Sequence, residues 1–242
     1  MRVRHFDHFF QMTLFPRFFP VNTYLVHHDD GLIVIDTGLP ISGPGIIRTL
    51  RSQAKPLTHI LLTHGHYDHA GSLDQIAQQF PAAQVACSQA ESAMLAGHSW
   101  EDSDGRRLDE KNLPGRWART RVQPTMILED GEHIGPLQVL ASPGHTPGHL
   151  SYWHEGAGAL FTGDAFQTQG RLAVAGDVIP TFPWVTRATW NQALALRSAR
   201  QLASLPIQYL ATAHGEVLTD PNSRLAAAIT RASKRLEGVA HT

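Results

Sequence analysis

The sequence predicts an α+β fold in which two β-sheets pack face to face and helices cover their outer faces. Short runs of β-branched and other apolar residues alternate with segments of helical apolar spacing in both halves of the chain. Apolar residues make up 42% of the chain and charged residues only 17%, which indicates a large buried core. A chain of 242 residues suits one large domain, so we expect residues 1–242 to form a single unit.

The first half of the chain alternates strands and helices. Residues 22–26 and 32–35 flank an Asp-Gly turn and therefore predict a β-hairpin. Ser72 stands where it can cap a helix that runs to about Phe80. The other predicted elements are a helix over 45–52, a buried strand over 59–62, a strand over 84–87 and a helix over 89–95.

Residues 97–121 differ from the segments around them, because they carry many charges of both signs and show no strand or long helix periodicity. Gly105, Pro114 and Gly115 interrupt the stretch further. We interpret residues 97–121 as a surface insertion that forms a lid, with a disordered segment as the alternative.

Short strands return after this insertion, and helices close the chain. Asn222 or Ser223 can cap the final helix. Predicted strands cover 126–128, 138–141, 150–153, 159–162 and 209–211, and predicted helices cover 189–205 and 222–236. Strands and helices in both halves are what a sandwich of two sheets with outer helices requires.

Charge and composition narrow the function classes. With 20 Lys and Arg against 21 Asp and Glu, the formal charge is -1, so we expect no nucleic-acid partner. The longest aliphatic runs fall far short of the roughly 20 residues that a membrane-spanning helix needs, and no export signal is visible. Cys87 is the only cysteine, which excludes an internal disulfide and fits a reducing, cytoplasmic location. We expect a soluble protein, with no membrane partner, that acts on a small-molecule substrate.

One loop concentrates side chains that bind metals. The string THGHYDHAG follows the buried strand and contains His64, His66, Asp68 and His69 within six residues. His64 and His66 are two residues apart at a strand end, so both can point to one side. Titratable groups this close together repel one another and lose solvation unless a cation compensates. Imidazole together with carboxylate suits zinc, iron or manganese.

Three further candidate ligands stand in glycine-bearing loops just past predicted strands. They are His145 in PGHTPGH, Asp164 in TGD and His214 in AHG. With several strands ending at one rim of the sandwich, these loops can converge on the histidine-rich loop. We therefore expect a metal site built from nitrogen and oxygen ligands.

The HxHxDH string from His64 to His69, together with the three later motifs in the same order, resembles the metallo-β-lactamase superfamily of metallo-hydrolases. The resemblance runs from about Asn22 to His214. It implies a four-layer αββα sandwich of two mixed sheets with two divalent metal ions at one edge, for which we expect Zn²⁺, with iron or manganese as alternatives. The ligand sets it implies are His64, His66 and His145 for the first metal, Asp68, His69 and His214 for the second, and Asp164 bridging both.

Two metal ions explain how such a site would hydrolyse a bond. Ions roughly 3.5–4 Å apart can share a hydroxide, lower its pKa toward neutrality and stabilise the oxyanion formed on an ester, thioester or lactone carbonyl. Asp68 is placed to orient the hydroxide and to pass a proton to the leaving group. We expect His149 and Asp36 to fix the tautomers of the ligand histidines, with a purely structural role as the alternative for His149.

Two aromatic groups are candidates for a wall of the substrate pocket. One lies in a proline-bearing segment before the first predicted strand, and the other follows the Asp164 loop. Core packing is the alternative explanation for both groups. The candidates are Phe15, Phe18, Phe19, Phe182 and Trp184.

Branches of the superfamily differ in the bond they cleave. Hydroxyacylglutathione hydrolases carry a histidine where this chain has Gly65, and acyl-homoserine lactonases share the PGHTPGH string but carry a tyrosine where it has Gln167. β-Lactamases of the commonest type use a cysteine where Asp164 stands. The charge balance disfavours a nuclease or phosphodiesterase of the same fold. His66 disfavours an iron-dependent redox enzyme, because diiron oxidoreductases usually carry a glutamate at that position.

Overall fold

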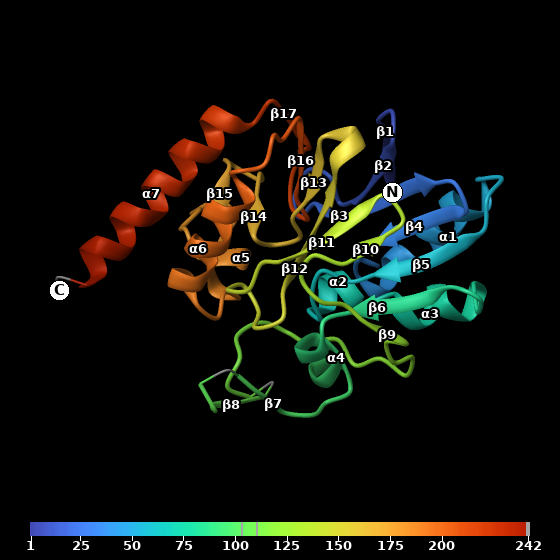
Figure 1. Ribbon diagram of the computed structural model, residues 1–242, viewed down its shortest axis with the longest axis horizontal. Helices are drawn as coiled ribbons and strands as arrows, with labels where there is room; N and C mark the ends of the chain where they lie inside the picture. Colours follow the sequence, from blue (N-terminus) through green and yellow to red (C-terminus); the bar gives the residue numbers. More distant parts are fainter. Residues whose placement is uncertain (103, 110, 241–242) are drawn as a thin grey trace.

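Two β-sheets pack against each other in the centre of the molecule, with helices on both outer sides (Figure 1). The computed structural model describes residues 1–102, 104–109 and 111–240. The covering helices are α1 (Gly43–Arg51) and α3 (Leu73–Gln79) on one side and α6 (Gln192–Leu202) and α7 (Asn222–Ala240) on the other. The predicted layer order of helix, sheet, sheet and helix is therefore confirmed.

The first sheet has seven strands, in the spatial order β1 (Arg2–His5), β2 (Phe9–Leu14), β3 (Val21–His28), β4 (Gly31–Ile35), β5 (Leu57–Leu61), β6 (Gln84–Cys87) and β9 (Met126–Ile127). Its first four strands are antiparallel neighbours. From β4 onward the neighbouring strands run parallel. Parallel strands end at the same edge of a sheet, so the segments that follow β4, β5 and β6 leave the sheet together.

The second sheet has six strands, in the order β10 (His133–Ile134), β11 (Leu137–Ala141), β12 (Leu150–His154), β13 (Ala159–Phe161), β16 (Tyr209–Ala211) and β17 (Leu218–Thr219). Only β13 and β16 are parallel among these neighbours in the described chain, so this sheet is mixed like the first. A separate hairpin of β14 (Phe166–Gln167) and β15 (Ala173–Val174) precedes the short helix α5 (Trp184–Arg187).

The main hydrophobic core fills the space between the two sheets. Phe9 and Tyr24 of the first sheet each place a ring centroid 5.1 Å from that of Phe161 in the second sheet. Two further cores lie on the outer faces, where Ile46 of α1 and Leu196 of α6 pack. Burial on both faces explains why the central strands read as continuous apolar runs.

Most predicted elements form close to their expected bounds. The predicted hairpin is β3 paired with β4, with Tyr24 opposite Ile35. The helix predicted over 89–95 is α4 (Gln89–Leu95). The predicted cap by Ser72 is wrong, because the Ser72 hydroxyl donates to the Leu39 carbonyl at 2.6 Å and leaves α3 without a side-chain cap.

The strands β1 and β2 were not predicted. In β2, Gln11 and Thr13 interrupt the apolar run, yet both side chains are fully buried. Gln11 donates to the carbonyl of Gly215 at 3.1 Å, and the Thr13 hydroxyl donates to the side chain of Asn22 at 2.8 Å. Because these partners accept hydrogen bonds from the two side chains, a polar pattern is buried where it would normally face solvent.

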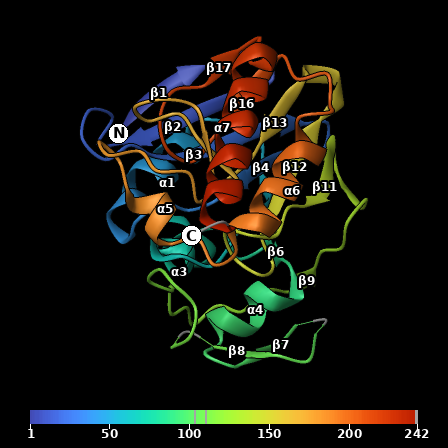
Figure 2. The same ribbon diagram turned by 90° about the vertical axis from the view of Figure 1, so that its left-hand side faces the viewer.

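The predicted insertion extends from the sandwich beside α4 (Figure 2). It contains a short hairpin, β7 (Trp100–Glu101) paired with β8 (Arg107–Leu108), although its sequence shows no strand periodicity. Leu108, Leu113 and Trp117 pack with Met94 of α4 into a small core of their own. In the sequence, the charged residues between these apolar residues hide their pattern. Residues 103 and 110 of the insertion lie outside the described residues.

In the described part of the chain, no helix combines the length and the apolarity that a membrane crossing requires.

Candidate metal centre

Loops from both sheets meet at one edge of the sandwich. The loop after β5 carries His64, His66, Asp68 and His69, the loop after β11 carries His145, and the segments after β13 and β16 carry Asp164 and His214. The amide of Leu150 donates to the carbonyl of Thr63 at 2.9 Å and so ties the first loop to the second sheet. All the predicted ligands are brought together: they form three overlapping groups, within each of which the ligand atoms lie within 4.8 Å of one another.

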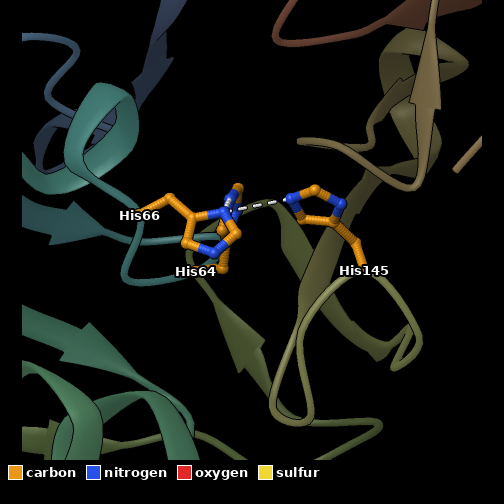
Figure 3. A group of neighbouring side chains, drawn as sticks. All are labelled: His64, His66 and His145. Carbon is orange, nitrogen blue, oxygen red and sulfur yellow. Dashed lines mark hydrogen bonds between the residues drawn. The ribbon is translucent and has the colours of Figure 1, made fainter. Parts of the chain in front are cut away.

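Three histidines form the first group (Figure 3). Nδ1 of His66 lies 3.1 Å from Nε2 of His64 and 3.1 Å from Nε2 of His145. All three side chains are buried. Rings from two different sheets therefore point their nitrogens at one place.

Asp68, His69 and His214 form a second group, and Asp164 lies between the two. Nε2 of His214 is 3.4 Å from Oδ2 of Asp68 and 3.3 Å from Oδ1 of Asp164. The other oxygen of Asp164, Oδ2, is 3.3 Å from Nε2 of His145 and 3.7 Å from Nε2 of His69. One carboxylate thus faces both groups.

Backbone carbonyls fix the tautomers of two of these histidines. Nε2 of His66 donates to the carbonyl of Pro114 at 3.2 Å, and Nδ1 of His214 donates to the carbonyl of Pro20 at 2.7 Å. A carbonyl oxygen only accepts hydrogen bonds, so the proton must lie on these outer nitrogens. In the neutral rings, Nδ1 of His66 and Nε2 of His214 present lone pairs to the centre of the cluster.

A threonine hydroxyl has the same effect on His145. The hydroxyl of Thr189 donates to the carbonyl of Val185 at 2.6 Å, and it lies 3.1 Å from Nδ1 of His145. Because its only proton is already engaged, this oxygen accepts the proton of Nδ1. Nε2 of His145 is left with a lone pair that faces His66.

Asp36 lies where it can fix the tautomers of two more of these histidines, His69 and His64. Its Oδ2 accepts from Nδ1 of His69 at 2.8 Å and from the hydroxyl of Thr63 at 2.8 Å. The Thr63 oxygen in turn accepts from Nδ1 of His64 at 3.0 Å. Asp36 has a φ of 59°, a strained conformation for a residue other than glycine, which the surrounding hydrogen bonds maintain.

The cluster therefore gathers lone pairs and negative charges without enough protons to pair them. Among the described residues, Nε2 of His69 and Oδ1 of Asp164 are buried and have no hydrogen-bond partner. Buried polar atoms are rarely left unpaired, because desolvation without a partner costs roughly 1–3 kcal/mol. Divalent cations at this position would satisfy these atoms, so the donor set fits metal ions.

Burial dominates the electrostatics of the three-histidine group. Burial lowers the pKa of His64 well below its ordinary value, and the neighbouring histidines lower it further. Burial also lowers the pKa of His145 well below its ordinary value, although the carboxylate of Asp164 acts in the opposite direction. Burial also lowers the pKa of His66 to about 4. These three rings are neutral at physiological pH, which is the form that binds a metal.

Carboxylates dominate in the second group. Burial alone would lower the pKa of His214, but Asp164 and Asp68 outweigh it and raise that pKa to about 10. Burial is likewise outweighed at His69, where Asp164, Asp36 and Asp68 hold the pKa well above its usual range. Without metal ions, protons on these two histidines supply the positive charge that the carboxylates require.

His149 supports the cluster from outside it. Its Nε2 accepts from the backbone amide of Asp164 at 3.2 Å, and its Nδ1 lies 2.9 Å from the hydroxyl of Ser142. Burial lowers the pKa of His149 to about 3, so the ring stays neutral and can accept this hydrogen bond. This contact fits the structural role that the sequence left open for His149, because His149 holds the backbone of the Asp164 turn and makes no hydrogen bond to a ligand ring among the described residues.

Glu91 is a supporting residue that the sequence did not reveal. This fully buried carboxylate accepts from the amide of Gly65 at 2.7 Å, from the hydroxyl of Thr146 at 2.6 Å and from the amide of Gly148 at 3.0 Å. It thereby joins the loop of His64 and His66 to the loop of His145. Burial raises its pKa to about 7. In the sequence, Ser88 and Glu91 resemble an ordinary helix-capping pair, which hides this role.

The glycine between His64 and His66 is required by its neighbours. A Cβ at Gly65 would lie 3.0 Å from the ring of Trp117 and 3.3 Å from Oε2 of Glu91. A larger side chain, such as a histidine, would displace the insertion from the metal loop. Residue 65 therefore has room for glycine alone without rearrangement.

A pocket of about 360 Å³ opens over the cluster. Its floor includes His66, Asp68, Asp164 and His214, and its walls include Phe19, Leu39, Trp184, Val185, Arg116 and Arg187. Of the aromatic candidates, Phe19 and Trp184 thus line the pocket. Phe182 is buried behind Phe19, at a centroid distance of 5.3 Å. Phe15 and Phe18 are exposed, and the structure does not place them in the lining.

Comparison with known proteins agrees with this geometry. The family model of the metallo-beta-lactamase superfamily matches residues 16–214. The chain is 42% identical to YobT, an uncharacterized protein of Bacillus subtilis (strain 168), over 97% of this chain and 100% of that protein. It is 32% identical to a hydroxyacylglutathione hydrolase of Rhodobacter capsulatus over 58% of this chain and 45% of the other.

A solved structure has the same fold. The crystal structure of the BLEG-1 B3 metallo-beta-lactamase matches with a TM-score of 0.67 and 27% identity, covering 89% of this chain and 95% of the other.

Proposed function

Because the chain belongs to the metallo-beta-lactamase superfamily, we propose that it is a hydrolase that uses two divalent metal ions to cleave an ester, thioester or lactone bond of a small molecule. One observation carries the proposal. Five histidines and two carboxylates cluster beneath a pocket, and His66, Asp68, Asp164 and His214 line it. Divalent cations would satisfy the buried atoms of this donor set that have no hydrogen-bond partner, and the pocket would give a substrate access to the cations.

The ligand assignment follows from which atoms face one another. His64, His66 and His145 would hold one ion, Asp68, His69 and His214 the other, and Asp164 would contact both. Nitrogen-rich sites of this kind suit zinc, which is our choice over iron or manganese. Bound divalent ions supply a nucleophile at neutral pH and polarise the carbonyl that it attacks.

Asp68 is the proposed acid/base residue. Its side chain is 23% exposed, whereas that of Asp164 is 5% exposed, and it lines the pocket. His69 and His214 outweigh the effect of burial and hold the pKa of Asp68 below its usual range. Asp68 is therefore ionised at neutral pH and can orient the nucleophile and carry a proton to the leaving group.

The pocket supports carbonyl chemistry on a small molecule. Apolar side chains form much of its wall, and its volume of about 360 Å³ is at the lower end of the range for small-molecule sites. The relative named hydroxyacylglutathione hydrolase supports a thioester substrate class. Gly65 argues against that particular substrate, since hydroxyacylglutathione hydrolases carry a histidine there. The chain's formal charge of -1 disfavours a nucleic acid.

The proposal also includes a reducing, cytoplasmic setting. Cys87, the only cysteine of the chain, is buried in the strand β6. Burial raises the pKa of its thiol well above the usual value, so it has little thiolate character. The proposed chemistry needs no cysteine and no disulfide.

A substrate panel tests the proposed function. Protein stripped with a chelator and protein reloaded with Zn²⁺, Fe²⁺ or Mn²⁺ would be assayed with a thioester, a lactone, a phenyl ester, a cephalosporin and bis-p-nitrophenyl phosphate. We expect hydrolysis of at least one carbonyl substrate by the loaded protein and none by the stripped protein. Cleavage of the phosphodiester alone, or hydrolysis that persists without metal, would contradict the proposal.

A further inference from the structure

We propose that the substrate carries a carboxylate on an apolar body, and that Arg116 and Arg187 bind this carboxylate at the mouth of the pocket above the candidate metal centre. The inference rests on the proposed function and names the substrate class for that same site. Its basis is the placement of two arginines in a pocket whose remaining wall is largely apolar.

The two arginines reach the pocket from separate parts of the fold. Arg116 belongs to the insertion, and its carbonyl accepts from the amide of Tyr67 at 2.7 Å, immediately after the ligand His66. Arg187 is the last residue of α5, in the segment between Asp164 and His214. Both line the pocket that has Asp68 and Asp164 in its floor. A substrate held over the metal ligands therefore lies within reach of both side chains.

The charge of these arginines is not neutralised within the described chain. No carboxylate of the described residues forms an ion pair with Arg116 or Arg187, although Arg171 pairs with Asp177 at 3.5 Å. The guanidinium of Arg116 lies over the ring of Tyr67, 3.9 Å from its centroid. This stacking fixes the position of the cation, and it leaves its hydrogen-bond donors for another group.

The apolar side chains of the lining would receive the apolar part of the substrate. Trp184 is 53% exposed although it lines the pocket, and Leu39 and Val185 line it as well. Phe19 packs against Phe182 and His214, at centroid distances of 5.3 and 5.5 Å, so its ring is already in position. An apolar acyl or aromatic group would cover this exposed surface.

A planar guanidinium is well matched to a carboxylate, because two parallel N–H groups can meet its two oxygens. Loss of one charge-assisted hydrogen bond costs roughly 1.5–3 kcal/mol, which corresponds to about 10–150-fold in binding. Each arginine should therefore change the preference between an acid and its neutral ester by at least about tenfold.

Matched substrates test this inference in the Zn²⁺-loaded protein. One substrate is monophenyl glutarate, which has a free carboxylate, and the other is its methyl ester, which is neutral. We expect a lower KM for the acid in the wild type, and a ratio of the two KM values that falls at least about tenfold in Arg116→Gln and in Arg187→Gln. Arg48→Gln, an exposed arginine on α1, is the control and should keep the wild-type ratio.

Binding to the metal-free protein gives a readout that does not depend on turnover. Quenching of tryptophan fluorescence would be measured with 4-phenylbutyrate and with its neutral amide, with Trp184→Phe to identify the signal of the pocket. We expect the anion to bind more tightly than the amide, and this preference to be lost in both arginine variants and retained in Arg48→Gln.

The two outcomes separate the inference from the proposed function. Equal KM values for acid and methyl ester, or arginine variants with the wild-type preference in both measurements, would overturn the carboxylate subsite while leaving metal-dependent hydrolysis intact. If the loaded protein hydrolyses no carbonyl substrate, the proposed function fails, and the fluorescence titration alone decides whether the two arginines bind a carboxylate.

Discussion

The two halves of the candidate metal centre share the loop after β5 but differ in charge. Burial lowers the pKa values of His64, His66 and His145, so these three rings are neutral at pH 7. His69 and His214 face carboxylates that outweigh burial and raise their pKa values. The first half is therefore ready to bind a cation at neutral pH, whereas the second must release protons when a cation binds.

This difference shows that close spacing of histidines does not by itself decide their pKa values. Nδ1 of His66 and Nε2 of His145 are 3.1 Å apart, and Nε2 of His214 and Oδ1 of Asp164 are 3.3 Å apart. The neighbours differ, since one pair joins two neutral rings and the other joins a ring to a carboxylate. Protons and metal ions therefore compete at the second half far more than at the first.

Asp164→Asn should have the largest effect, because this carboxylate faces both halves. Amide substitution removes the negative charge that lies 3.3 Å from His145 and 3.3 Å from His214. We expect hydrolysis to fall by about 10³-fold or more, equivalent to several kcal/mol of barrier. Elemental analysis of the same sample should find clearly fewer ions per chain than in the wild type. Unchanged metal content would show that the two halves do not share this ligand.

Asp68→Asn should lower the rate through chemistry more than through metal binding. A positioned acid/base group contributes about 10²–10⁴-fold, or roughly 3–5 kcal/mol. Turnover per bound metal pair would be compared with the wild type. Because the pKa of Asp68 is held below its usual range, the carboxylate stays ionised as pH falls to about 5, and the ratio of the two rates should be constant between about pH 5 and pH 8. Equal turnover per metal pair would restrict Asp68 to a ligand role.

His214→Ala and His145→Ala sharpen the comparison in the absence of metal. Removing His214 deletes a protonated ring that lies 3.3 Å from the buried carboxylate of Asp164 and 3.4 Å from that of Asp68, and the loss of such a charge partner typically costs about 3–5 kcal/mol. Removing His145 deletes a neutral ring and should cost less, roughly 1–3 kcal/mol. Urea unfolding of the chelator-treated variants measures both values. Equal losses would contradict the difference in charge between the two halves.

Gly65→Ala should have the smallest effect and should act on the first half alone. The new methyl group would lie 3.0 Å from the ring of Trp117, so the insertion or the loop must shift. Overpacking of this kind costs about 1–3 kcal/mol. We expect weaker binding of one ion, measured by competition with a chelating dye, and unchanged binding of the other. Weakening of both ions alike would contradict this assignment.

Much of the site could be predicted from the sequence because its ligands stand in short strings at strand ends. The loop from His64 to His69 contains four of the predicted ligands within six residues. The groups that fix the rings could not be predicted, since Pro114 supports His66 and Pro20 supports His214 from distant segments. Backbone carbonyls carry no residue-type signal, so only the fold reveals them.

The fold was predictable where the patterns are strong and local. Strands and helices with regular apolar spacing, such as β6 and α4, matched their predicted bounds. Other segments depend on tertiary partners. Gln11 in β2 is buried because a carbonyl near His214 accepts its hydrogen bond, and Trp117 is buried because the insertion packs on the metal loop. Because Gln11 is polar and Trp117 lies among charged residues, neither contact can be predicted from the local sequence.

A metal titration with simultaneous proton counting tests the central claim most directly. Zn²⁺ would be added to the chelator-treated protein in a pH-stat at about pH 7, and bound metal and released protons would be measured together. The account predicts about two ions per chain, and the ion bound by His69 and His214 should release about two protons more than the other ion. Saturation at a single ion, or equal proton release for both ions, would contradict it.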